Sequence, residues 1–188
     1  MISHKMKEIE EIVIKKISAY RTSLENMHLL ETVHSYIENN KDKFIDRTFN
    51  CNVRTSQKVV KNILYDVAEF SYLTTNLENM IKGFLHQTLG KHVPFIIFES
   101  WINIYGKNGY QESHIHVPPG EGGVTGVGCL YLTENNSEIQ FIVYPEVTTK
   151  NIIPKKGDVV FFDGTTFHRV IDSEDERISL AFNFKVLP

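Results

Sequence analysis

Residues 157–170 read GDVVFFDGTTFHRV, an apolar run held between two turns. The first turn contains Gly157, and the second, at Asp163-Gly164, delivers His168 to the segment that follows. β-Branched and aromatic residues bounded by turn residues are typical of a buried strand. The pattern therefore predicts two short strands joined by a tight turn, a unit common in all-β architectures.

Similar strand-like runs occupy the second half of the chain, after Pro94. Each is rich in β-branched or aromatic residues and is bounded by Gly, Pro or Asn: Phe95–Tyr105, Thr125–Leu132, Glu138–Val143, Val159–Phe162 and Ile178–Val186. Several short strands separated by turn signals predict a barrel or a jelly roll, which is also called a double-stranded β-helix. We expect residues 93–188 to form this core.

The first half of the chain has a helical periodicity instead. Apolar residues recur at helical spacing from Lys5 to about Asn39, with charged residues between them. Two further helices are expected, over Val59–Phe70 with Ser56 as N-cap, and over Leu77–Leu85 with Thr75 or Asn76 as N-cap and Gly90 beyond the end. We expect residues 1–92 to support one face of the jelly roll, and residues 1–188 to form a single α+β domain, because no flexible linker separates the halves.

The composition excludes several classes of protein. Of 188 residues, 41% are hydrophobic and 23% are charged, as in ordinary globular domains. The net charge of −3 and the lack of a basic run argue against a nucleic-acid partner, since phosphate contacts need a concentrated basic face. No apolar stretch could cross a bilayer, and Met1–Lys16 lacks the apolar core of a signal peptide. We therefore expect a soluble cytoplasmic protein, in the host cytoplasm if the source is viral, with free thiols at Cys51 and Cys129.

The histidines give the first indication of chemistry. His114 and His116 stand two residues apart, and on an extended strand such side chains point to the same face. Two neutral imidazoles that converge can clamp a transition metal, and His168 offers a third. The other histidines have no partner at ligand spacing and are expected on the surface or in packing: His4, His28, His34, His86 and His92.

A candidate anion site follows His168 in the sequence. Arg177 and Ser179 stand two residues apart at the start of the last expected strand, so they share a face. The apolar side chains of Ile178 and Leu180 would occupy the opposite face. A guanidinium and a hydroxyl at the inner end of a pocket can bind a carboxylate.

These segments resemble those of a known family, the iron(II)- and 2-oxoglutarate-dependent oxygenases. YGKNGYQESHIH (105–116) is similar to the approach to the metal in prolyl 4-hydroxylase-like members, and GDVVFF (157–162), His168 and RISLAFN (177–183) resemble their C-terminal signature. A still closer resemblance is to the short 2-oxoglutarate oxygenases of phages of marine bacteria. Those proteins also have a helical N-terminal half and His-x-His where relatives have His-x-Asp.

The resemblance implies a role for each candidate residue. The ligands of Fe(II) would be His114, His116 and His168, with the remaining positions open for 2-oxoglutarate and O2. The far carboxylate of 2-oxoglutarate would bind Arg177 and Ser179, with a further hydroxyl from Tyr105. The products are succinate, CO2 and a substrate hydroxylated at a C–H bond. The side chains of Asn103 and Asn183 are candidates to face the substrate, Trp101 is expected in the core, and Pro118–Gly123 forms either part of the substrate mouth or an ordinary surface loop.

One position departs from the family pattern. His116 stands where relatives have a carboxylate, so a site with three histidine ligands would carry one negative charge less. We favour direct ligation by His116. The alternative is a site with two histidine ligands, in which water takes the third place and His116 lies behind it.

Two other functions remain open at the level of sequence. A cupin-type dioxygenase with three histidines and no 2-oxoglutarate, such as a thiol dioxygenase, explains His-x-His but leaves Arg177 and Ser179 without a role. A non-catalytic jelly-roll binding module would need no metal. For the oxygenase, the favoured substrate is a residue of a peptide or protein, prolyl among them, with a small molecule as the second choice.

Overall fold

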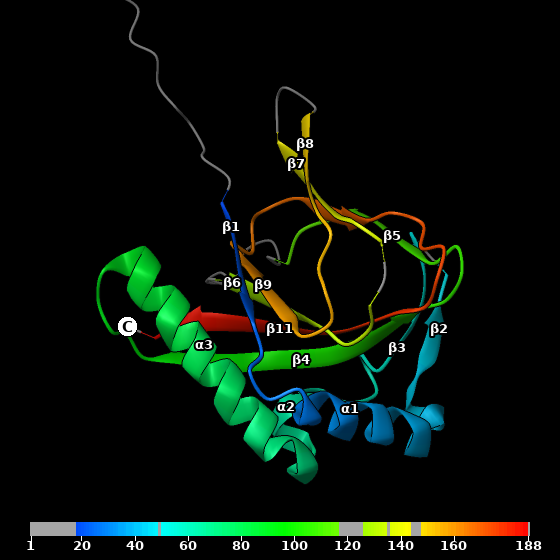
Figure 1. Cartoon of the computed structure of the whole chain (residues 1–188), viewed down its shortest axis with the longest axis horizontal. Coiled ribbons are helices and arrows are strands. Elements are labelled where there is room, and N and C mark those ends of the chain that lie inside the picture. The colour runs from blue at the N-terminus through cyan, green and yellow to red at the C-terminus, as the bar shows by residue number, and fades with distance from the viewer. Residues whose placement is uncertain (1–17, 49, 117–125, 135, 144–147, 188) are drawn as a thin grey trace, which may run out of the picture.

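The computed structural model describes residues 18–48, 50–116, 126–134, 136–143 and 148–187 (Figure 1). Within them no helix is both long enough and apolar enough to cross a membrane. The helical elements are α1 (His28–Asn39), η1 (Lys41–Lys43), α2 (Ile63–Asp66), η2 (Ala68–Phe70) and α3 (Ser71–Leu89). The strands are β1 (Ala19–Ser23), β2 (Ile45–Arg47), β3 (Cys51–Thr55), β4 (Phe95–Tyr105), β5 (Tyr110–His114), β6 (Gly126–Tyr131), β7 (Ile139–Val143), β8 (Thr148–Ile152), β9 (Asp158–Phe162), β10 (His168–Val170) and β11 (Arg177–Val186).

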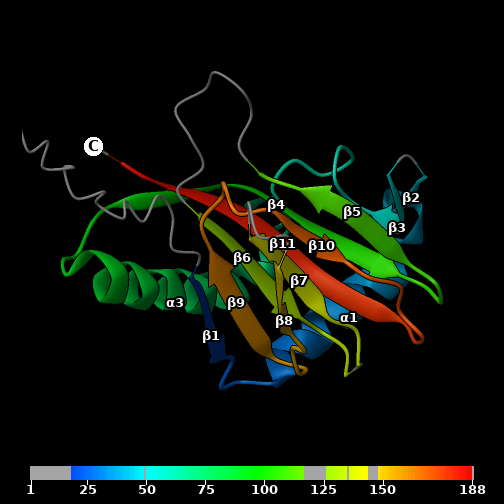
Figure 2. The ribbon, with the colours of Figure 1, turned by 90° about the horizontal axis from the view of Figure 1, so that it is seen from above.

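The strands form two antiparallel sheets that curl around a common interior, as Figure 2 shows from above. One sheet has the order β1-β9-β6-β11-β4-β3, and the other has the order β3-β5-β10-β7-β8, so the strands follow one continuous path; β2 lies off this path and pairs with β3. Strand β3 joins them, because its Arg54 and Thr55 pair with β4 while Cys51 and Asn52 pair with β5. This half-barrel is a jelly roll, so the predicted fold class is confirmed.

The long strand β11 separates the interior of the roll from the layer of helices. Its apolar residues Ile178, Leu180, Phe182 and Phe184 belong to one hydrophobic cluster with residues of α1 and α3. The alternate residues Arg177, Ser179 and Ala181 line a pocket on the opposite face. Because side chains alternate along a strand, one segment builds both the structural core and the wall of a site.

Helix α3 packs on the outer face of the β11 sheet (Figure 1). The ring of Phe84 stacks on Phe161 of β9 at a centroid distance of 5.1 Å and meets Phe184 edge to face at 6.0 Å. The sheet itself is closely packed on this face: a Cβ added to Gly128 of β6 would lie 2.1 Å from the ring of Phe182, its register partner on β11. The helix ends at Gly90, whose φ of 69° is the left-handed conformation that glycine adopts without strain.

The helical prediction for Lys5–Asn39 is wrong over residues 19–23. These residues form β1, which pairs antiparallel with β9 at the edge of the sheet, and the helix α1 begins only at His28. Residues 5–17 lie outside the described part of the chain. Pairing with β9 and the contact of Tyr20 with Phe84, at 5.2 Å, decide the conformation, because tertiary contacts override a weak helical pattern.

The helix predicted over Val59–Phe70 is also wrong in its extent, since of these residues, all of them described, only those of α2 and η2 are helical. Ser56 is not an N-cap; its hydroxyl accepts a hydrogen bond from the backbone N–H of Ile102 at 3.0 Å. Helix α3 begins at Ser71, before the predicted caps Thr75 and Asn76. The first half is therefore not purely helical, because β1, β2 and β3 join the sheets.

Candidate functional site

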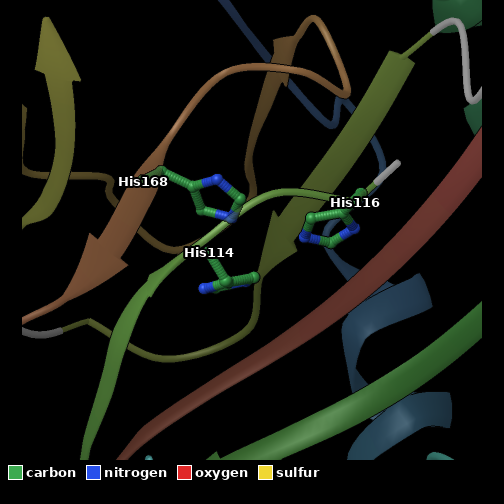
Figure 3. A group of neighbouring side chains, drawn as sticks. All are labelled: His114, His116 and His168. Carbon is green, nitrogen blue, oxygen red and sulfur yellow. The ribbon is translucent and has the colours of Figure 1, made fainter. Parts of the chain in front are cut away.

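Three histidines meet where the ends of two strands lie side by side (Figure 3). His114 ends β5 and is the register partner of His168, the first residue of β10. His116 lies two residues further on, held by a hydrogen bond from its N–H to the carbonyl of Gly164 at 3.0 Å. Their candidate ligand atoms all lie within 4.8 Å of one another. The structure therefore brings the three predicted metal residues together, close enough that they could hold one ion.

The second ring nitrogen of each histidine already has a partner. Nδ1 of His114 lies 2.8 Å from the carbonyl oxygen of Glu112, and Nδ1 of His168 lies 3.0 Å from that of Thr166. Nδ1 of His116 lies 2.8 Å from the side-chain Oδ1 of Asn183. An oxygen acceptor requires a proton on Nδ1, which leaves the lone pair of each neutral imidazole on Nε2. Metal-binding histidines in proteins are oriented in this way.

The electrostatic environment keeps the three imidazoles neutral. Burial lowers the pKa of His114 and lowers the pKa of His168 well below its usual value. Burial and, secondarily, the repulsion that a protonated His114 would exert lower the pKa of His116 to about 4. Neutral imidazole is the form that binds a metal ion, so the cluster is poised for ligation near neutral pH.

A buried guanidinium lies in the pocket that the histidines line. Arg177 is 1% exposed, its Nη1 donates to the carbonyl oxygen of Glu138 at 3.1 Å, and its Cζ lies 5.0 Å from the ring centre of Tyr131. Among the described residues, none accepts a hydrogen bond from its Nε and no carboxylate forms an ion pair with it. A buried cation without a counter-charge is costly, and an anion bound at this end of the pocket would offset that cost.

The other predicted co-substrate residues border the same narrow pocket. Ser179 is the register partner of both Asn103 on β4 and Tyr131 on β6, and all three line the pocket. The Tyr105 hydroxyl donates to Oε1 of Gln111 at 2.8 Å. Burial raises the pKa of Tyr105, so this hydroxyl stays protonated and remains a donor.

An open cleft of about 850 Å³ lies on the outer side of the histidines. His114 and His116 contribute to its wall, so the cluster lies between this cleft and the inner pocket. The cleft has both basic and acidic side chains, those of Arg47, Lys58, Lys61, Glu99 and Glu112. Its volume is in the range of small-molecule and peptide-side-chain sites in enzymes.

Two predicted residues have different surroundings from those expected. Asn183, a candidate to face the substrate, lines the cleft but bonds both His116 and Glu99. Trp101 is buried as expected, yet its ring stacks with that of His116 at 5.7 Å and forms the pocket wall. Glu99 itself was missed, although it alternates with Trp101 and Tyr105 along β4, a signal that the sequence contains.

The other described histidines and the two cysteines are not members of the cluster formed by His114, His116 and His168. His34 bonds the carbonyl oxygen of Leu132, and His86 stacks on His92. Neither cysteine forms a disulfide within the described structure, and Cys129 lines the inner pocket. His4 and the loop Pro118–Gly123 lie outside the described residues.

Comparison with solved structures finds the same fold in two prolyl hydroxylases and in a protein with 2-oxoglutarate bound. A prolyl-4-hydroxylase from Pseudomonas putida superposes with a TM-score of 0.69 at 13% identity, over 90% of this chain and 93% of that chain. A prolyl hydroxylase from Trichoplax adhaerens, in complex with a peptide fragment of a hypoxia-inducible factor, gives 0.68 at 13% identity over 88% and 82%. HygX from Streptomyces hygroscopicus, with nickel, 2-oxoglutarate and hygromycin B bound, gives 0.63 at 11% identity over 89% and 82%.

No protein-family model and no curated protein matches the sequence. The likeness at these identities concerns the fold, and the chemistry of this chain depends on its own site.

Proposed function

We propose that this chain is an Fe(II)- and 2-oxoglutarate-dependent oxygenase that hydroxylates a C–H bond of its substrate. One observation carries the proposal: three imidazoles with oriented Nδ1 groups line the same pocket as a buried guanidinium that has no carboxylate partner among the described residues. A metal site beside an anion site suits a co-substrate that chelates the metal and carries a second carboxylate. When bound, iron, 2-oxoglutarate and O2 supply oxidative decarboxylation to succinate and CO2 coupled to hydroxylation.

The three histidines would hold the metal through Nε2. Direct ligation by His116 is favoured over a water-filled third position because its ligand atom lies within 4.8 Å of those of His114 and His168. The hydrogen bond from its Nδ1 to Asn183 leaves the lone pair on Nε2, as in the other two histidines. Imidazole donors on one face suit a first-row transition metal such as Fe(II).

Arg177 and Ser179 would bind the far carboxylate of 2-oxoglutarate, with the Tyr105 hydroxyl nearby. The Nε of Arg177, for which the described residues provide no acceptor, is the donor that such a carboxylate would satisfy. The pocket is narrow and its wall contains the apolar side chains of Ile139 and Phe162, which exclude water from the ion pair. The Tyr105–Gln111 hydrogen bond would have to open if the tyrosine is to donate to the co-substrate.

For the substrate we propose a residue of a peptide or protein, with a prolyl residue favoured. The open cleft beside His114 and His116 can admit a side chain presented by a larger molecule. Prolyl hydroxylases are among the structures of the same fold, one of them with a peptide bound. A small molecule is the second candidate, since HygX has hygromycin B bound.

Calorimetric titration of 2-oxoglutarate into the protein loaded with Mn(II) tests the proposal. We expect one site for each chain, and no binding would exclude this function even if the metal itself is held. The substrate can then be sought by mass spectrometry, as a product heavier by one oxygen atom after incubation with cell extract, Fe(II) and 2-oxoglutarate.

A second function is favoured by the ligand set alone. A cupin-type dioxygenase with three histidine ligands, such as a thiol dioxygenase, would also lack a carboxylate ligand. It would not use Arg177, and the same titration separates the two, because such an enzyme binds metal but does not bind 2-oxoglutarate.

A further inference from the structure

A chain of side-chain hydrogen bonds runs from the wall of the cleft to His116. Nη1 of Arg47 lies 2.6 Å from Oε1 of Gln57, whose Nε2 lies 3.5 Å from Oε1 of Glu99. From the other side, Nδ2 of Asn183 lies 3.0 Å from Oε2 of Glu99, and Oδ1 of Asn183 lies 2.8 Å from Nδ1 of His116. Glu99 is therefore the point at which two series of donors meet.

The direction of each hydrogen bond follows from the groups at its ends. A guanidinium can only donate, so it turns the Gln57 amide with oxygen towards Arg47 and nitrogen towards Glu99. A carboxylate can only accept, so it turns Asn183 with its NH2 towards Glu99 and its oxygen towards His116. His116 then has to carry its proton on Nδ1, which places the lone pair on Nε2, the nitrogen left for a metal.

The fold brings Glu99 and Asn183 together by strand register. They are direct partners on β4 and β11, next to a register shift between Asn183 and Phe184. Both line the outer cleft beside His116. The Glu99 carboxylate is separated from His116 by two hydrogen bonds, through Asn183. His116 in turn stands at the position where the family pattern has a carboxylate ligand.

We propose that Glu99 is a positioning residue that acts through Asn183 to fix the tautomer and orientation of His116. This inference rests on the proposed function, because it assigns His116 to the metal. Through Asn183, Glu99 also places a negative charge near the three histidines, which would otherwise bind the metal without any carboxylate. Carboxylates placed behind a histidine ligand orient it and raise its basicity.

The logic of donors and acceptors provides a sharp test. In Glu99→Gln the amide cannot accept from both Gln57 and Asn183, so one donor faces another donor. In the double variant Glu99→Gln/Asn183→Asp every bond is restored, because the introduced amide accepts from Gln57 and donates to the introduced carboxylate, which also accepts from His116. The double variant has the same net charge as the wild type, with the charge moved from β4 to β11.

The measurement is titration of each purified protein with Co(II), followed by its visible absorption bands. We expect Glu99→Gln to bind Co(II) about ten- to a hundredfold more weakly, the range found when a partner behind a metal ligand is lost. We expect the double variant to recover most of the affinity and the wild-type spectrum. Glu69→Gln, an exposed glutamate on η2 in the helical layer, is the matched control and should bind Co(II) as the wild type does.

The outcomes distinguish this inference from the proposed function. If the wild type binds Co(II) and Glu99→Gln binds it equally well, the inference is wrong and the metal site stands. If Glu99→Gln is weak and the double variant is equally weak, Glu99 does not act through the direction of hydrogen bonds, and the inference is again overturned. If the wild type binds no Co(II), the proposed function fails and the inference fails with it. Circular dichroism of the metal-free proteins shows whether each variant is folded.

Discussion

Replacing Arg177 with methionine should separate the function of this buried residue from its effect on stability. Methionine keeps the unbranched stem of the side chain to about the position of Nε, but removes the charge and every donor. In the wild type the guanidinium is 1% exposed, and the described residues provide neither an acceptor for its Nε nor an ion pair. If Arg177 exists to bind a ligand, the ligand-free protein should tolerate its loss while 2-oxoglutarate binding should not.

The magnitudes follow from these contacts. An unsatisfied buried donor costs about 1–3 kcal/mol, which the variant recovers. It loses the hydrogen bonds from Nη1 to the carbonyl oxygens of Glu138 and Ser137, each worth about 0.5–1.5 kcal/mol, and the contacts with the Tyr131 and Tyr105 rings, each worth about 0.5–2 kcal/mol. It also no longer buries a charge without a counter-charge, and such burial costs several kcal/mol. The gains and losses are of similar size, so the unfolding midpoint should change by only a few degrees. The co-substrate carboxylate loses its buried partner, at about 3–5 kcal/mol. This is a loss of affinity of about a hundredfold or more, since about 1.4 kcal/mol is tenfold.

Thermal unfolding and calorimetry together provide the assay. We would compare the unfolding midpoint with and without 2-oxoglutarate in the presence of Mn(II). The affinities for Mn(II) and for 2-oxoglutarate would be measured by titration. Metal affinity should be nearly unchanged in Arg177→Met. The control is Arg169→Met, because Arg169 is exposed on β10 and bonds only Gln140 in the described structure. Retained 2-oxoglutarate affinity in Arg177→Met, or a loss of stability as large as about 3–5 kcal/mol, would show that the guanidinium is structural.

Further expectations concern the histidines and the packing of the sheet. Alanine variants of His114, His116 and His168 should each weaken Co(II) binding to a similar degree, and near-normal binding by His116→Ala would remove it from the ligand set. His116→Asp should still bind Fe(II), but its affinity for 2-oxoglutarate in a titration should fall, because the added charge opposes a dianion. Gly128→Ala should lower the free energy of unfolding in urea by about 1–3 kcal/mol, since its Cβ would meet the Phe182 ring at 2.1 Å; an unchanged midpoint would show that the ring moves aside easily.

Local sequence patterns predicted much of the fold and of the candidate site. The alternation along residues 177–180 predicted that Arg177 and Ser179 share one face of the strand and Ile178 and Leu180 the other. In the structure the first pair lines the inner pocket and the second pair belongs to the core under the helices. The i, i+2 spacing of His114 and His116 predicted that they would lie together, as they do. The first of these inferences depends on one short segment, whose periodicity decides where its side chains point. The second depends on more than strand spacing, because β5 ends at His114 and the backbone of His116 is held by the carbonyl of Gly164.

Other features depended on register between distant segments. Nothing local to residues 19–23 indicates that they pair with β9 far along the chain, so helical spacing was a misleading guide there. Likewise Arg47 and Gln57 come from a part of the sequence expected to be helical support, yet they line the cleft. Strand pairing is settled by the burial of whole surfaces, which a window of sequence does not contain.

The sequence by itself determined the residue types of the site: histidines at strand spacing, and an arginine and a serine on one face of the last strand. Only the tertiary structure decided how each group is oriented. Asn183 reaches His116 across 67 positions and Glu99 across 84, through hydrogen bonds whose direction depends on which atom meets which. The physical reason is that composition and periodicity specify donors and acceptors, whereas their partners are chosen by the register in which β4 and β11 pair.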